Sequence, residues 1–163
     1  MKVFKFGGAS VKDAAGVKNL SSIVHQQHGQ LIVVVSAMGK TTNLLETLCN
    51  AYFHQDPKTT AIMKELKNFH LDIVNTLFPL NDTIHKHLEE LFTSLENILA
   101  SESSLCYDYE YDRIICFGEL ISTTIISDYL KMKGIENQFI DIRKFLKTDQ
   151  NYRNANIDLE LSE

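Results

Sequence analysis

Two short apolar runs near the start of the chain predict β-strands. The first spans residues 2–6, and the second, at 31–35, is an unbroken run of leucine, isoleucine and valine. Unbroken apolar runs are typical of parallel strands that helices cover on both faces. Between them, apolar residues recur every three or four positions, which predicts an amphipathic helix over about 12–28. We expect residues 10–13 to form its capping box and Gly29 to end it, giving a right-handed βαβ unit.

The middle of the chain has a helical period throughout. Three helices are expected there, at residues 43–53, 57–78 and 82–100, divided by the segments 54–57 and 79–82. Downstream the pattern predicts a long helix at 108–133 ended by Gly134, a strand at 137–141, a helical turn at 142–146 and a weaker strand at 154–161. The elements together predict one α/β unit, residues 1–163, with a helical insertion at about 43–105.

Composition and charge narrow the classes of protein. A length of 163 residues allows one sizeable core. The net charge of −5 argues against nucleic acid or an anionic membrane as the main partner, since both attract basic surfaces. No run approaches the ~20 apolar residues of a membrane helix, and the first residues do not form a secretory signal. Three widely spaced cysteines indicate neither a disulfide framework nor a zinc site, so we expect a cytoplasmic protein.

The loop after the first strand has the composition of a phosphate site. Lys5 lies near the carboxyl end of the strand, where open α/β sheets bind their ligands. Gly7 and Gly8 lack side chains, so backbone N–H groups can approach an anion there, and the following helix points its positive end at the same place. The same residues also fit an ordinary strand-to-helix turn with Lys5 extending to solvent, and the two interpretations are equally open.

Two further stretches could carry chemistry. The loop from Ser36 to Asn43 holds three hydroxyls and an amide, which suits a small polar ligand or ordinary helix capping; Val34 stands where a P-loop requires glycine. In the long helix, Glu119 shares a face with apolar residues and follows Gly118, which costs ~1 kcal/mol in a helix interior. This pattern predicts a buried acid that meets either a cationic ligand or a structural ion pair. We find no metal-binding pattern in the sequence.

The three stretches together resemble the aspartate kinases of the amino acid kinase superfamily. The family's Lys-Phe-Gly-Gly-Thr-Ser-Val motif stands here at residues 5–11, with alanine in place of threonine at position 9. The family's Val-Val-Ser-Ala-Met-Gly…Thr-Asn loop stands at 34–43, and its Gly-Glu…Ser motif at 118–122. A later Asp-…-Arg…Thr-Asp segment matches residues 141–149. Each motif is weak alone, but all four stand in the family's order.

The resemblance implies a three-layer αβα sandwich with a mainly parallel sheet, of which this chain would form the N-terminal half. The implied activity is phosphorylation of the side-chain carboxylate of L-aspartate by ATP with Mg²⁺, a first step of lysine, threonine and methionine biosynthesis, in a homo-oligomer. The contacts that the resemblance assigns to the ATP phosphates are Lys5, Phe6, Gly7, Gly8, Ala9 and Ser10, with Lys5 as the catalytic group. The contacts that it assigns to aspartate are Ser36, Thr42 and Glu119.

The resemblance covers only part of an aspartate kinase. The family's kinase domain continues further and supplies the nucleotide-base site, and regulatory ACT domains follow it. We therefore expect this chain to be inactive by itself. Two alternatives stay open: a non-catalytic module that binds an amino acid or another subunit, and another member of the superfamily such as glutamate 5-kinase or acetylglutamate kinase. The loop beginning at Ser36 distinguishes the aspartate kinases from those two enzymes.

Overall fold

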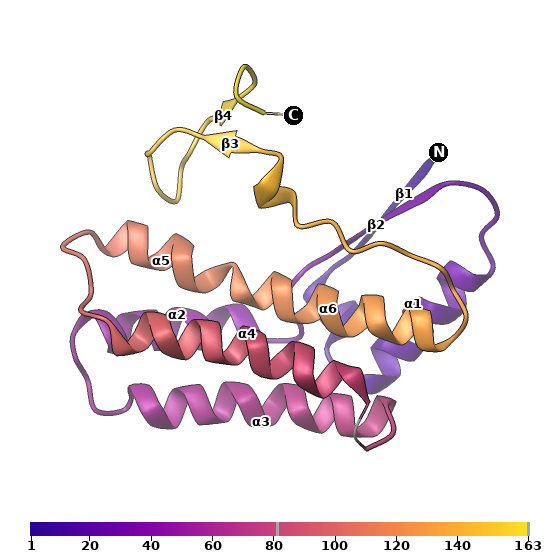
Figure 1. Cartoon of the computed structure of the whole chain (residues 1–163), viewed down its shortest axis with the longest axis horizontal. Helices are drawn as coiled ribbons and strands as arrows, with labels where there is room; N and C mark the ends of the chain where they lie inside the picture. Colours follow the sequence, from indigo (N-terminus) through magenta and orange to yellow (C-terminus); the bar gives the residue numbers. More distant parts are fainter. Residues whose placement is uncertain (81, 163) are drawn as a thin grey trace.

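The computed structural model describes residues 1–80 and 82–162 (Figure 1). Strand β1 (Lys2–Phe6) pairs in parallel with β2 (Leu31–Val35), with Lys2 opposite Leu31 and Phe6 opposite Val35. The connection between them contains the 3₁₀ helix η1 (Gly8–Val11) and helix α1 (Ala14–His25), so the predicted βαβ unit is confirmed. Because the strands are parallel and in register, the loops that follow them lie at the same edge of the sheet.

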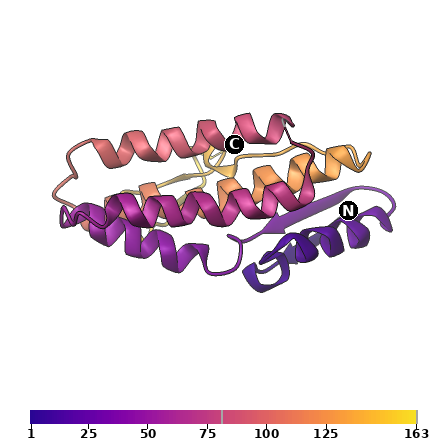
Figure 2. The same cartoon turned by 90° about the horizontal axis from the view of Figure 1, so that it is seen from below.

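In the described part of the chain, five helices follow β2 and form most of the molecule. These helices are α2 (Thr41–Phe53), α3 (Thr59–Leu77), α4 (Thr83–Ala100), α5 (Tyr107–Ile115) and α6 (Phe117–Met132). Helix α2 packs on α3 and α5, and α4 packs on α6, while α6 also contacts β2 and α1. The sheet and α1 therefore lie at one end of the helical group (Figures 1 and 2).

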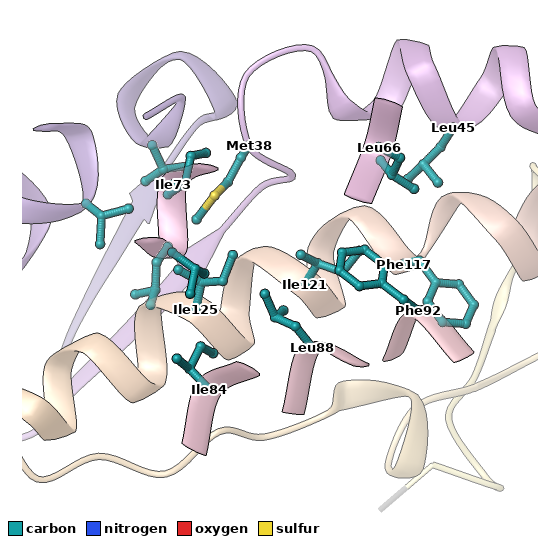
Figure 3. Close-up of a cluster of buried hydrophobic side chains, with 14 of the residues drawn as sticks. Met38, Leu45, Leu66, Ile73, Ile84, Leu88, Phe92, Phe117, Ile121 and Ile125 are labelled. Carbon is teal, nitrogen blue, oxygen red and sulfur yellow. The ribbon is translucent and has the colours of Figure 1, made fainter. Parts of the chain in front are cut away.

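A single apolar core joins the helical segment to the loop that follows β2. Met38 is fully buried and points from that loop towards side chains of α3 and α6 (Figure 3). Ile121 and Ile125 of α6 lie beside it, and Phe92 and Leu88 of α4 extend the cluster. Burial of large aliphatic and aromatic side chains is the main stabilising term in a fold of this size. The position of the loop after β2 thus depends on the same core that holds the helices together.

Most of the predicted helices are confirmed, with two changes at their ends. Helix α1 is capped by Asp13, whose carboxylate accepts the Gly16 N–H at 2.9 Å, so the predicted capping box at 10–13 is wrong. Residues 8–11 form η1 instead, because the chain must turn off the sheet before α1 begins. Helix α1 also ends at His25, four residues before Gly29. The predicted division at 79–82 includes Asn81, which lies outside the described residues.

The last third of the chain differs from the prediction. The long helix expected at 108–133 is two helices, α5 and α6, which meet at Cys116. Residues 137–141 are not a strand, because the described part of the chain places no partner strand beside them. The helical turn at 142–146 is confirmed as η2 (Ile142–Lys144). The strand expected at 154–161 shrinks to β4 (Ile157–Asp158), which pairs antiparallel with β3 (Lys147–Thr148).

The β1–β2 sheet is covered on one face, whereas the sequence pattern predicted cover on both. Alternate side chains of both strands, such as Phe6 and Val33, pack against the core. The residues between them face outward, and Val3, Ile32 and Val34 are 59%, 45% and 46% exposed. Apolar side chains on an open sheet face indicate a surface that suits further packing. Among the described helices, none has the length and apolarity needed to cross a membrane.

Candidate functional site

The loops after β1 and β2 are joined by backbone hydrogen bonds. The Ser36 N–H donates to the Phe6 carbonyl oxygen at 3.1 Å, which continues the strand pairing by one residue. The Gly39 N–H donates to the Gly8 carbonyl oxygen, also at 3.1 Å. These bonds bring the first two predicted motifs into a single site at the carboxyl edge of the sheet. This edge is where open α/β sheets place their ligands.

The two adjacent glycines of the first loop have different structural roles. A Cβ at Gly8 would lie 2.7 Å from the Ala37 carbonyl oxygen, so only glycine lets the two loops approach this closely. A Cβ at Gly7 would meet nothing within 4 Å, and the backbone there is extended with φ −74°. Close packing therefore requires glycine at position 8, whereas no packing contact requires glycine at position 7. The open space beside Gly7 is available to a ligand.

Helix α6 contacts the second loop through the third motif. A Cβ at Gly118 would lie 2.8 Å from the Ala37 Cβ and 3.2 Å from Leu45 Cδ1, so the glycine allows α6 to pack directly on the loop. One residue later, Glu119 Oε1 accepts the Ala37 N–H at 3.1 Å. The buried Ser122 hydroxyl donates to the Ser36 carbonyl oxygen at 2.9 Å. Three contacts from one helix thus fix the loop that begins at Ser36.

The predicted burial of Glu119 is wrong. Glu119 is exposed, because it lies at the edge of the contact between α6 and the second loop and not on the core-facing side of the helix. Among the described residues its second oxygen, Oε2, has no hydrogen-bond partner, so it can accept a cationic group from solvent. Lys5 lies on the open face of the sheet and is also exposed, in line with the alternation of β1. Both charges can therefore meet a ligand at little desolvation cost.

A buried histidine of α3 contacts the same loop, and sequence reasoning missed it. The Thr41 hydroxyl donates to the Met38 carbonyl oxygen at 2.6 Å and lies 3.3 Å from His70 Nε2. His70 is fully buried, and its Nδ1 lies 2.8 Å from the Leu66 carbonyl oxygen. Burial lowers the pKa of His70 to about 4, so the ring is neutral at pH 7. A single histidine among apolar residues of a helix gives no sequence signal for this contact.

An arginine from the C-terminal segment contacts Cys116, directly before α6. Arg143 forms a two-point ion pair with Asp141, at 2.7 Å and 2.9 Å, and its third nitrogen lies 3.3 Å from Cys116 Sγ. Cys116 precedes Glu119 by one helical turn, so the guanidinium lies on the same side of α6. The hydrogen bonds from Arg143 lower the pKa of Asp141. The Asp-…-Arg motif was visible in the sequence, although its partner Cys116 was not.

The described residues contain no metal site built from protein ligands alone. Within residues 1–80 and 82–162, no group of three or more histidine, cysteine, aspartate or glutamate residues could hold a metal ion. Magnesium prefers several oxygen ligands in octahedral geometry. In kinases it is usually held by one or two carboxylates together with substrate phosphates and water, so a three-residue protein cluster is not required for it.

Comparison with known proteins identifies the family. Residues 1–161 match the amino acid kinase family over nearly the whole chain. The chain belongs to the amino acid kinase family. It is 31% identical to aspartokinase 2 of Arabidopsis thaliana chloroplasts, over 95% of this chain and 29% of that protein. It is 27% identical to the lysine-sensitive aspartokinase 3 of Escherichia coli, over 96% of this chain and 34% of that protein.

Solved structures of this family have the same fold. The chain aligns with Escherichia coli aspartokinase III in complex with lysine and aspartate with a TM-score of 0.87 and 25% identity, over 99% of this chain and 36% of that one. The complex of the same enzyme with aspartate and ADP gives a TM-score of 0.86. The amino acid kinase fold expected from the sequence is confirmed. The chain spans about a third of the length of these relatives.

All the predicted site residues of this amino acid kinase chain lie around one edge of the sheet. The first loop carries Gly7, Gly8, Ala9 and Ser10, directly after Lys5 and Phe6 of β1. The second loop begins with Ser36, and Thr42 lies exposed in the first turn of α2. Neither Thr42 nor Asn43 caps α2, because the helix already begins at Thr41 and has no side-chain cap. The capping interpretation of this loop is therefore wrong.

We predict that Gly118→Ala destabilises the protein. Alanine is the better helix former, but its Cβ would overlap Ala37 and crowd Leu45, so we expect the free energy of unfolding to fall by about 1–3 kcal/mol. Gly7→Ala is the matched control, since its Cβ meets nothing and its backbone suits alanine. Urea unfolding of the three proteins measures the effect. Equal stability of Gly118→Ala and wild type would contradict the close approach of α6.

We predict that His70 makes stability fall with decreasing pH. Its pKa is about 4 in the folded protein against 6.5 for a free histidine, so the unfolded state binds more protons between these values. The unfolding free energy should therefore fall by up to about 1.4 kcal/mol per pH unit as pH drops from 6.5 towards 4, and the stability is fully present above 6.5. Urea unfolding of wild type and His70→Gln, at matched pH values, isolates this contribution. Parallel stability curves for the two proteins would disprove it.

Proposed function

We propose that this chain is the aspartate-binding part of an aspartate kinase. The observation that carries the proposal is the hydrogen bond from the Ala37 N–H to Glu119 Oε1, which joins two motifs 82 residues apart in the sequence. This bond leaves Glu119 Oε2 facing solvent beside a loop of hydroxyl groups. A carboxylate next to hydroxyls is suited to the ammonium group of an amino acid. The aligned Escherichia coli structures, which contain aspartate, support this choice of ligand.

In this proposal each predicted residue has a defined contact. Glu119 accepts hydrogen bonds from the substrate ammonium group, and Ser36 and Thr42 donate to its carboxylates. Lys5 and the N–H groups of Gly7 and Gly8 hold the phosphates of ATP in the open space beside Gly7. Ala9 contributes its backbone only, because the family hydroxyl is missing at this position. Both substrates then meet at the carboxyl edge of one sheet.

The proposed reaction is a direct transfer of the terminal phosphoryl group of ATP. An oxygen of the aspartate side-chain carboxylate attacks the terminal phosphorus, the bond to the bridging oxygen breaks, and ADP leaves with its electron pair. Such transfers depend on positioning and on neutralising charge that spreads over the phosphoryl oxygens. The ammonium group of Lys5 can do the second task because it lies exposed at the site edge. Glu119 positions the aspartate by binding its ammonium group.

The remaining parts of the enzyme are absent from the described residues. The described residues contain no cluster of three protein ligands for a metal ion. The chain covers about a third of the length of its aspartokinase relatives. We therefore infer that the isolated chain binds substrate but does not turn it over. The open apolar face of the sheet supports assembly with further chain or with a second copy as a homo-oligomer. Free cysteines and an acidic surface are consistent with the cytoplasm as its compartment.

We predict that amide NMR resonances of the isolated chain respond to two ligands at two places. L-aspartate should shift the amides of Ala37 and Thr42, and a non-hydrolysable ATP analogue should shift those of Gly7 and Gly8. Lys5→Ala should weaken only the second response, since a phosphate contact is lost. A hydroxamate assay for aspartyl phosphate should show no product from the isolated chain. The absence of both responses would refute the proposed function, whereas turnover by this chain would show that the site is complete.

We predict that Glu119→Gln weakens L-aspartate binding at least about tenfold and leaves binding of the ATP analogue unchanged. The amide keeps the hydrogen bond with the Ala37 N–H but lacks the charge that attracts ammonium, a difference of about 1.5–3 kcal/mol. The same NMR titration measures both affinities, and Lys5→Ala serves as the reciprocal control. An equal loss for both ligands would mean that Glu119 acts only through the fold.

A further inference from the structure

The contact between His70 and Thr41 connects the helical segment to the candidate site. His70 belongs to α3, which holds none of the predicted site residues. Its ring is fully buried between two phenylalanines, Phe69 at 4.9 Å and Phe92 at 6.3 Å between ring centroids. The Thr41 side chain is 2% exposed. The two residues therefore meet inside the core, directly beneath the second loop.

The hydrogen atoms of this contact can be assigned by elimination. A carbonyl oxygen only accepts, so His70 Nδ1 must carry the proton that is shared with the Leu66 oxygen at 2.8 Å. A neutral ring then has no proton on Nε2, which can only accept. The Thr41 hydroxyl has one proton and two acceptors, the Met38 oxygen at 2.6 Å and His70 Nε2 at 3.3 Å. The single proton points to the nearer Met38 oxygen and is shared with His70 Nε2 in a three-centre bond, so both acceptors lie on the side that the hydroxyl faces.

Thr41 in turn determines the shape of the second loop. Its N–H and its hydroxyl both donate to the Met38 oxygen, at 3.0 Å and 2.6 Å, which closes the turn from 38 to 41. Gly39, inside this turn, has φ +56°, a conformation that needs its neighbours to be well fixed. A Cβ at Gly39 would lie 3.5 Å from Phe69, so α3 also supports the turn from below. Thr42, the proposed aspartate contact, is the next residue.

We propose that His70 is a positioning residue that holds the loop from Ser36 to Thr42 in its aspartate-binding shape through Thr41. The proposal rests on the proposed function for its ligand, but the effect of His70 on the loop itself can be measured without any ligand. The contact of His70 with Thr41 gives the helical segment a role in the site, because α3 then supplies a polar contact to the loop as well as apolar packing.

Two substitutions of His70 separate the contact with Thr41 from the contact with Leu66. The glutamine amide nitrogen can reach the place of Nε2, so His70→Gln keeps a partner for Thr41. The shorter His70→Asn reaches only the region of Nδ1 and leaves the Thr41 hydroxyl without its second partner. Thr41→Val removes the hydroxyl while it keeps the shape of the side chain. We expect His70→Asn and Thr41→Val to loosen the loop, and His70→Gln to preserve it.

Hydrogen exchange and ligand titration of the full chain provide the test. In His70→Asn and Thr41→Val, the amides of Gly39 and Thr41 should exchange at least tenfold faster, while those of a distant helix such as α4 keep their rates. L-aspartate affinity should fall about tenfold or more, and affinity for the ATP analogue should stay unchanged. The double variant should lose no more than Thr41→Val alone, because that substitution already removes the hydroxyl contacts with both Met38 and His70. His70→Gln should keep wild-type exchange and affinity within about threefold.

Each other outcome has a distinct meaning. Unchanged exchange at Gly39 and Thr41 in His70→Asn would overturn the positioning role, even if Thr41→Val loosens the loop by losing its bond to Met38. Equal losses for aspartate and the ATP analogue, or faster exchange throughout the chain, would also overturn it, because they would show a general effect on folding. If wild type does not bind aspartate, the proposed function fails, and the exchange rates alone decide the role of His70. If His70→Asn does not fold, His70→Leu provides the comparison, because it also removes the partner of Thr41 and keeps the Thr41 bond to Met38.

Discussion

The whole site depends on the close approach of helix α6 to the loop that follows β2. Glycine at position 118 removes the side chain that would separate them, and the contact brings Glu119 and Ser122 to the backbone of Ala37 and Ser36. The same loop is joined to the first loop at Gly8, where a second missing side chain allows the approach. Two glycines therefore hold three segments, distant in sequence, at one edge of the sheet.

The spacing of apolar residues predicted the strands and helices whose formation depends on the local sequence. The strands at 2–6 and 31–35 and the helices of the middle segment follow from apolar spacing, and the structure confirms them. The break at Cys116 and the loss of the strand at 137–141 depend on which elements lie alongside in three dimensions, which spacing does not reveal. The motifs predicted the candidate site residues, but the exposure of Glu119 depends on its place at the edge of a tertiary contact. The contact of His70 with Thr41 spans 29 residues and has no local signal.

The helical segment links stability to the geometry of the site. Met38 extends from the second loop into the core formed by α3, α4 and α6, so the loop is part of that core (Figure 3). On the other side of the molecule the sheet exposes Val3, Ile32 and Val34. The fold thus has one well-packed face that fixes the candidate site and one open face with apolar residues. This asymmetry is consistent with a chain that covers about a third of its relatives.

The central claim is that one amino acid binds between Glu119 and the loop from Ser36 to Thr42. A crystal structure of the chain grown with L-aspartate tests it most directly. The account predicts aspartate at this edge of the sheet, with its ammonium nitrogen within hydrogen-bond distance, about 3 Å, of Glu119 Oε2. Aspartate bound elsewhere, or bound here with its ammonium group turned away from Glu119, would contradict the account.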